Sequence, residues 1–86
     1  MNAYKITGTS RKAGAIGISE TFVRVIQSES ARSAYLENQI FLYAKDRDHV
    51  LTTRVQESKL TDQIGPATIG SGWVDVAPEI WLYPSP

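Results

Sequence analysis

The stretch Ser28-Glu-Ser-Ala-Arg-Ser-Ala-Tyr-Leu-Glu-Asn-Gln-Ile-Phe-Leu-Tyr-Ala44 decides the fold, because it has the composition of the chain's one helix. Ser28 and Ser30 are both suitable N-caps, since a serine oxygen accepts a hydrogen bond from an unpaired N–H group of the first helical turn. Glu29 suits the positive end of the helix dipole. No glycine or proline interrupts the stretch, and we therefore predict a helix over residues 28–44.

Two interpretations of the end of this helix stay open. The run Ile40-Phe-Leu-Tyr-Ala44 is apolar on every side, which suits either a helix end buried on several sides or a short strand. In the interpretation that we prefer, the helix continues to Ala44. In the other interpretation the helix ends near Asn38, and a hairpin follows through Lys45–Asp48.

Three further segments predict the strands of an antiparallel sheet. In Ala3–Thr9, Tyr4 and Ile6 alternate with polar residues. Ile18–Ile26 carries β-branched and aromatic residues on both faces, which predicts a strand in the middle of the sheet or one that curls around the helix. Val50–Gln56 alternates again. One face of this third strand is expected to carry Leu51, Thr53 and Val55.

The last third of the chain changes in character. Ser58–Gly72 contains several glycines and predicts a long loop. Trp73–Val76 and Glu79–Tyr83 predict one or two short strands, and Pro78 between them limits any pairing to an edge of the sheet. The sequence therefore predicts a single α+β domain over residues 1–86. Its small antiparallel sheet follows the order β-β-α-β, plus the short C-terminal strands, with one helix packed on one face.

Composition limits the classes of function. A chain of 86 residues has room for one helix on one sheet, so we expect no enclosed cofactor pocket and no cofactor. Nine Lys plus Arg balance nine Asp plus Glu, whereas a strong nonspecific nucleic-acid binder usually has a basic excess. The absence of cysteine excludes disulfides and thiolate metal sites. No apolar run approaches the ~20 residues of a membrane helix, so we expect a cytoplasmic protein without membrane contact.

Two motifs suggest chemistry but do not meet its requirements. Gly8–Gly17 is rich in glycine and cations, but Ala15 stands where a phosphate-binding loop requires lysine. Asp46, Asp48 and His49 could be metal ligands, but no second cluster completes a coordination sphere. His49 is the chain's one histidine, so a Ser-His-acid mechanism would rest on it alone. We expect no metal site, no catalytic residues and no enzymatic activity.

Aromatic and basic residues supply the candidates for binding a partner. Trp73, Trp81 and Tyr83 lie in a C-terminal segment without Lys or Arg, which favours a protein partner over nucleic acid. The alternative is that these rings close the core, and we predict that at least one of them stays exposed. Arg11 and Lys12, in the loop predicted over residues 10–17, are candidates for contact with an acidic protein surface.

The second hypothesis is a small nucleic-acid-binding domain. Residues 1–26 hold four cationic residues and one carboxylate, a local basic excess. The four candidate phosphate ligands are Lys5, Arg11, Lys12 and Arg24. A homodimer formed by pairing of exposed strand edges is a further hypothesis about partners.

In layout the chain resembles the small accessory proteins of phages and mobile elements, among them the anti-CRISPR inhibitors. The matching features are its size, the absence of cysteine, the hairpin that begins Tyr4-Lys-Ile-Thr7, the helix capped by Ser28 and the strand Val50-Leu-Thr-Thr53. The resemblance covers about the first 57 residues. It implies a non-enzymatic inhibitor that blocks a larger host nucleoprotein complex by stoichiometric binding in the host cytoplasm, and it transfers no functional residue.

Overall fold

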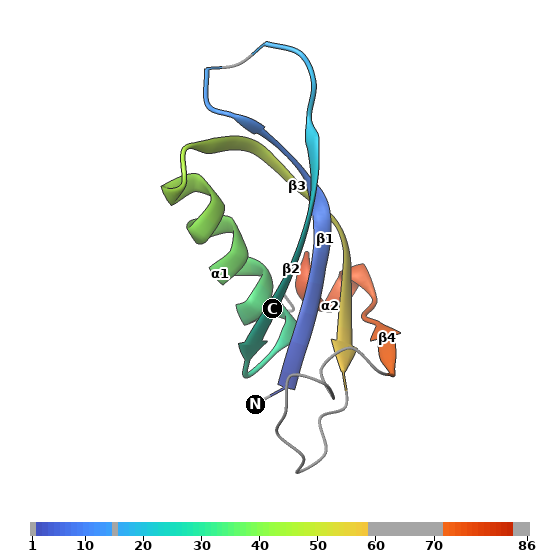
Figure 1. Ribbon diagram of the computed structural model, residues 1–86. Coiled ribbons are helices and arrows are strands. Elements are labelled where there is room, and N and C mark those ends of the chain that lie inside the picture. The colour runs from blue at the N-terminus through green and yellow to red at the C-terminus, as the bar shows by residue number, and fades with distance from the viewer. Residues whose placement is uncertain (1, 15, 59–71, 84–86) are drawn as a thin grey trace.

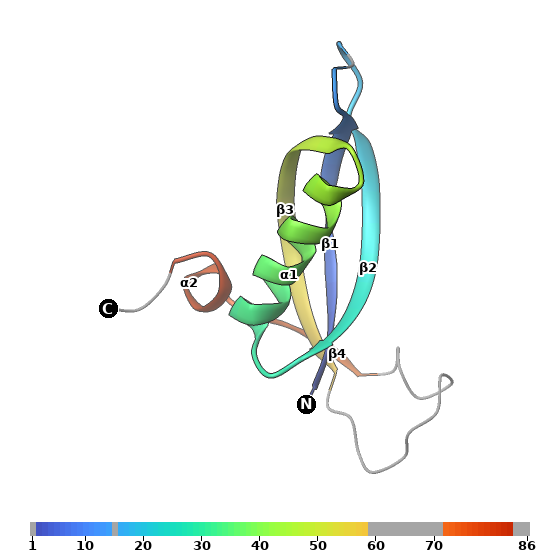
Figure 2. The same cartoon turned by 90° about the vertical axis from the view of Figure 1, so that its left-hand side faces the viewer.

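The computed structural model describes residues 2–14, 16–58 and 72–83. Its elements are β1 (Asn2–Lys12), β2 (Glu20–Ser28), α1 (Ala31–Ala44), β3 (Arg47–Ser58), β4 (Trp73–Asp75) and α2 (Pro78–Trp81). The strands form one antiparallel sheet in the order β2-β1-β3-β4, and α1 packs on one face of it (Figures 1 and 2). The predicted α+β fold is confirmed. The loop predicted over residues 58–72 lies almost entirely outside the described residues.

The helix α1 is delimited by its caps. The Ser30 hydroxyl accepts a hydrogen bond from the backbone N–H of Ser33 over 3.0 Å, so Ser30 rather than Ser28 is the N-cap. At the other end the backbone N–H of Lys45 donates to carbonyls of the last turn, and Asp46 adopts a left-handed φ of 61°. The helix therefore continues through Ala44, which confirms the preferred interpretation, and the hairpin alternative is wrong.

The strand β2 lies at an edge of the sheet, so the prediction of a central position is wrong. Residues of β2 that face α1 pair with the core-facing residues of β1, as Arg24 does with Ile6. Val23 and Val25 point to the opposite face, where they remain exposed. The apolar character on both sides of β2 therefore reflects one covered face and one exposed apolar face. The helical crossover places β3 on the other side of β1, which makes β1 a central strand.

A bulge in β3 changes which of its residues share a face. Thr7 pairs with Arg54 and Gly8 pairs with Thr52, which leaves Thr53 as the extra residue. A Cβ atom on Gly8 would overlap the Leu51 carbonyl oxygen, so only glycine allows this close approach of the two strands. The predicted common face of Leu51 and Val55 is therefore wrong: Val55 is buried in the core, whereas Leu51 is exposed.

The C-terminal segment closes the core with a helical turn. Glu79–Tyr83, predicted as a strand, instead lies in and just after α2, because Pro78 occupies the first helical turn, where its missing N–H costs nothing. The Trp81 ring packs 5.2 Å from the Tyr35 ring of α1, measured between centroids. Trp81 joins a core that otherwise comes from β1, β3 and α1, with the members Tyr4, Ile6, Ala31, Ala34, Val55 and Trp81.

Candidate functional site

The side of α1 that points away from the sheet carries a row of apolar residues. Leu36, Ile40 and Tyr43 follow one another at helical spacing, so their side chains form a row along the helix. They are 42%, 71% and 52% exposed, respectively. The opposite side of α1 faces the sheet and is buried. We call the row formed by Leu36, Ile40 and Tyr43 the outer face of α1; it is an uncharged apolar surface in contact with solvent.

Two cations lie around the Phe41 ring, on the side of α1 that faces β2. The guanidinium carbon of Arg24 lies 3.7 Å from the centre of the Phe41 ring, and Lys45 Nζ lies 5.4 Å from it. Arg24 Nη1 also donates to Asn38 Oδ1 over 2.9 Å. Burial lowers the pKa of the Arg24 guanidinium from its usual value. Among the described residues, neither Arg24 nor Lys45 forms an ion pair with a carboxylate.

A further cation, Arg32, lies one helical turn before Leu36 and beside α2. Arg32 Nη1 donates to the backbone carbonyls of Trp81 and Leu82, over 2.9 and 3.1 Å. This contact attaches α2 to α1 and leaves the charge of Arg32 without a carboxylate partner among the described residues. Within α1, the one carboxylate is Glu37. The charged residues of α1 are thus Arg32 and Glu37, one of each sign.

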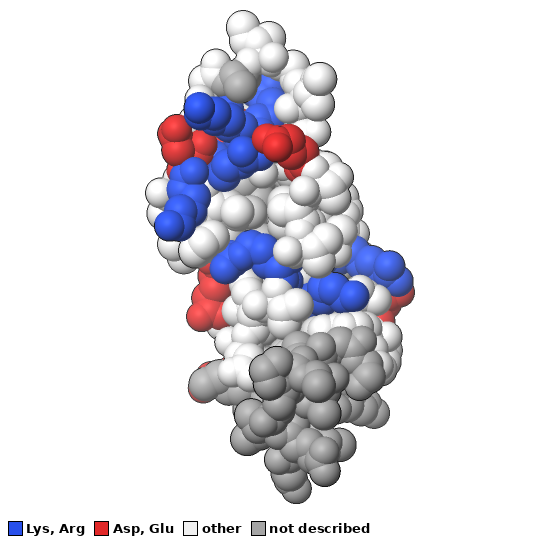
Figure 3. All heavy atoms as spheres, viewed as in Figure 1, with Lys and Arg blue, Asp and Glu red and all other residues white. Residues whose placement is uncertain are grey.

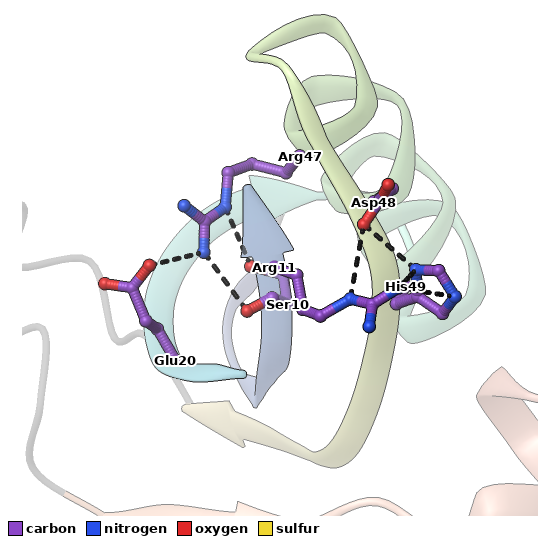
Figure 4. Close-up of polar contacts among 6 residues, drawn as sticks. All are labelled: Ser10, Arg11, Glu20, Arg47, Asp48 and His49. Carbon is purple, nitrogen blue, oxygen red and sulfur yellow. Dashed lines mark hydrogen bonds and ion pairs between the residues drawn. The ribbon is translucent and has the colours of Figure 1, made fainter. Parts of the chain in front are cut away.

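Polar contacts hold together the end of the sheet that extends past the helix (Figures 1 and 4). Arg47 Nε donates to Ser10 Oγ, and its Nη2 donates to the Ser10 carbonyl and to Glu20 Oε1, each over 3.1 Å. The three residues come from β3, β1 and β2. Arg47 therefore joins three strands at this end, where Ser10 is buried although the helix has already ended.

The neighbouring contact joins Arg11 of β1 to Asp48 and His49 of β3 (Figure 4). His49 Nδ1 lies 2.9 Å from Asp48 Oδ1, and Arg11 Nη2 lies 2.7 and 2.9 Å from the two ring nitrogens. The hydrogen bond with His49, and to a smaller extent the charge of Arg11, hold the pKa of the Asp48 carboxyl below its usual value. Asp48 and His49 thus cross-link two strands. The described residues contain no group of three side chains suited to a metal ion.

The structure separates the four residues proposed as phosphate ligands. Arg11 and Lys12 lie within β1, which extends three residues further than predicted, and Arg11 is bound to Asp48. Lys5 lies on the face opposite α1, with its Nζ 5.0 Å from the Trp73 ring, whereas Arg24 faces α1. In Figure 3 the basic residues form two groups, with acidic residues beside each and uncharged surface between them. These residues form no continuous basic surface among the described part of the chain.

The three C-terminal aromatic rings have different environments. Trp81 is only 3% exposed, and its indole N–H donates to the Val76 carbonyl. Its ring therefore has no free surface to offer a partner. Trp73 is half-buried beside Lys5, and Tyr83 is 62% exposed. The prediction that at least one ring stays exposed is confirmed by Tyr83, and β4 lies at an edge of the sheet as predicted.

Sequence reasoning missed the two large apolar side chains that are most exposed among the described residues. Ile16 and Ile18, in the connection between β1 and β2, are 100% and 90% exposed. The alternating pattern assigned Ile18 to a strand that would be covered, whereas β2 begins at Glu20. The outer face of α1 had a signal in the sequence, because Leu36, Ile40 and Tyr43 lie opposite the residues suited to face a sheet.

No protein-family model matches this chain, and no curated protein and no solved structure matches it. Among the described residues, neither helix has the length and apolar character needed to cross a bilayer.

Proposed function

We propose that this chain is a non-enzymatic protein-binding module that receives an apolar helix of a partner protein on the outer face of α1. The observation that carries the proposal is the exposure of Ile40, which is 71% exposed at the centre of an uncharged row. Leu36 and Tyr43 extend that row by one helical turn on either side. Contiguous exposed apolar surface of this kind is typical of interaction sites.

The spacing of the outer face suits a helical partner. Residues at positions i, i+4 and i+7 form the row that amphipathic helices use to dock on apolar surfaces. Burying each of these side chains contributes about 1.5–3 kcal/mol before the costs of association. Because the other side of α1 is anchored in the core, binding requires little loss of conformational entropy to order the helix. Tyr43 is the expected hot spot, since tyrosine buries a large area with few rotatable bonds.

A cation at one end of the outer face defines the chemistry of the partner's flank. Arg32 lies one helical turn before Leu36 and forms no ion pair within the described part of the chain. A partner helix with a carboxylate beside its apolar residues would complement Arg32. Such pairs increase the association rate and make it sensitive to ionic strength.

A narrower proposal concerns the consequence of binding. The resemblance in layout to phage accessory proteins supports a stoichiometric inhibitor that blocks a larger host complex, as anti-CRISPR proteins do. Expression of the chain in a bacterium with an active CRISPR system should then restore plaque formation by a targeted phage. Unchanged interference across the available CRISPR types would contradict this narrower proposal and leave the docking surface to be tested separately.

The docking surface is tested by affinity capture with matched variants. Immobilised protein is incubated with bacterial lysate, and Ile40→Glu is compared with Leu51→Glu. The control places the same charge on an apolar residue of the opposite face, which is 61% exposed against 71% for Ile40. A partner that docks on α1 is retained by the unmodified protein and by Leu51→Glu and lost with Ile40→Glu. Equal retention by both variants would show that the outer face of α1 takes no part.

A further inference from the structure

The outer edge of β2 has the properties of a strand that pairs with another strand. Figure 2 shows β2 at the border of the sheet, beside β1, and no other described strand pairs with it. Its pairing with β1 runs without interruption from Glu20 to Ser28, whereas the pairing of β1 with β3 contains two register shifts. β2 contains no proline, no lysine and no bulge, which are features that protect sheet edges from association.

Apolar side chains lie along this edge on both faces of the sheet. Val23 and Val25 are exposed on the face opposite α1. Ile18, just before the strand, is 90% exposed. Phe22 and Ile26 face α1, where they are partly buried against the core. A second strand beside β2 would cover residues from both sets.

The charged residues of β2 indicate which strand fits. Arg24 has no carboxylate partner among the described residues, and its environment is partly desolvated. Glu20 lies on the same face of β2, and its contact with Arg47 uses Oε1. The strand therefore carries a carboxylate and a guanidinium two positions on either side of Phe22. Reversing the direction of this strand exchanges the positions of the two charges, so the strand is complementary in charge to an antiparallel strand of the same sequence.

We propose that β2 pairs antiparallel with β2 of a second copy of this chain, about a two-fold axis that passes beside Phe22. In this register Glu20 lies opposite Arg24 of the second copy, and the same pair forms again on the other side of the axis. Ile18 lies opposite Ile26, and Thr21 lies opposite Val23. Residues directly opposite one another in an antiparallel pair share a face of the sheet, so the pairing keeps both α1 helices on the same side.

The competing registers are less favourable. An axis beside Arg24 would place the two Arg24 residues directly opposite one another, and like charges in that position are destabilising. An axis beside Val23 would place Arg24 opposite Phe22 and leave it without a carboxylate. Of these three registers, the axis beside Phe22 is the one that places a carboxylate opposite Arg24.

The dimer goes beyond the proposed function and is independent of it. It joins two four-stranded sheets into one continuous sheet, because each free β2 edge is occupied by the other. It also presents two outer faces of α1 on the same side, which would allow bivalent binding to a partner with repeated sites. Loss of the dimer would leave each single docking surface unchanged.

Charge exchange tests the register in solution. Sedimentation equilibrium of the unmodified protein should give a dimer that dissociates on dilution. Arg24→Glu or Glu20→Arg alone should weaken association about ten-fold or more, since two attractive pairs become repulsive, and the double variant should restore it. A monomer at all concentrations, or a dimer that neither single variant weakens, would overturn the proposal. Circular dichroism of each variant checks that it remains folded.

Cross-linking tests the same register with substitutions at solvent-facing positions on the face opposite α1. The natural chain has no cysteine, so Thr21→Cys and Val23→Cys are made separately and then mixed under mild oxidation. Directly opposite residues have Cα atoms about 4.5–5.5 Å apart, within the roughly 4.4–6.8 Å that a disulfide requires. The mixture should form a linked heterodimer faster than either variant forms a homodimer. No cross-link, or equal cross-linking of each variant alone, would overturn the register.

Discussion

The indole N–H of Trp81 donates to the Val76 carbonyl over 3.1 Å, and this bond joins the last helical turn to the residue that follows β4. It satisfies the one polar group of a ring that is otherwise enclosed by the core. The C-terminal segment therefore belongs to the folded domain, and the stability of the domain depends on this tryptophan.

Replacement of Trp81 by alanine should lower the free energy of unfolding by about 3–5 kcal/mol, because it leaves a large cavity between α1 and the sheet. Tyr83→Ala is the matched control, since Tyr83 is exposed, and should change that free energy by less than about 0.5 kcal/mol. Urea unfolding followed by circular dichroism measures both. Equal stability of the two variants would contradict the assignment of Trp81 to the core.

Because β1 and β3 approach closely at the bulge, a single methyl group added at Gly8 should lower the stability of the protein. Gly8→Ala should destabilise the protein by about 1–3 kcal/mol, because its Cβ would meet the Leu51 carbonyl and the Thr52 backbone. Gly14→Asn provides the control, since no atom lies within 4 Å of that Cβ position and asparagine tolerates a positive φ. Thermal unfolding of the two variants should differ clearly, and a Gly8→Ala protein as stable as the control would be evidence against the bulge.

Acid should weaken the contact between Arg54 and Asp75. The two side chains form two hydrogen bonds, and these bonds hold the pKa of Asp75 below its ordinary value of 3.8. Because the folded-state pKa is the lower one, the unfolded state binds the proton more readily. The stabilisation is therefore complete above the unfolded-state pKa and is lost as the pH falls through the folded-state pKa.

The measurement for this contact is the urea midpoint as a function of pH. The unmodified protein should lose more stability than Asp75→Asn between about pH 5 and pH 2. Both groups are exposed, so the difference should be small and should shrink further in high salt. Identical pH dependence of the two proteins at low salt would show that the contact does not form in solution.

Substitution of Tyr43 should weaken binding to a partner without lowering the stability of the fold. Tyr43→Ala removes a half-exposed ring from the outer face of α1, so the free energy of unfolding should change by less than about 0.5 kcal/mol. Binding to a partner captured in the affinity experiment should weaken by about 2 kcal/mol or more, as expected for a hot-spot tyrosine. Calorimetric titration and thermal melts on the same samples test both values, and a large loss of stability would instead assign Tyr43 to the fold.

The first hairpin and α1 could be predicted from the sequence because their signals are local. Ser30 caps the helix through a residue three positions away, and helical spacing alone separates Ala31 and Ala34 from Leu36 and Ile40. Alternation likewise identified the buried side of β1. The row that forms the outer face was therefore visible in the sequence, although its exposure was not.

Tertiary structure decided the features that depend on neighbours distant in the chain. The edge position of β2 follows from the side of β1 on which β3 pairs, a choice that the composition of β2 does not encode. The bulge at Thr53 reverses the faces of the residues before it. The sequence of β3 alone does not predict this bulge, because the glycine that permits it, Gly8, lies on β1. Trp81 became a core residue because α1 and the sheet leave a space that its ring fills. Local propensity determined β1, β2, α1 and β3, and packing between distant segments determined which of their faces remain free to bind.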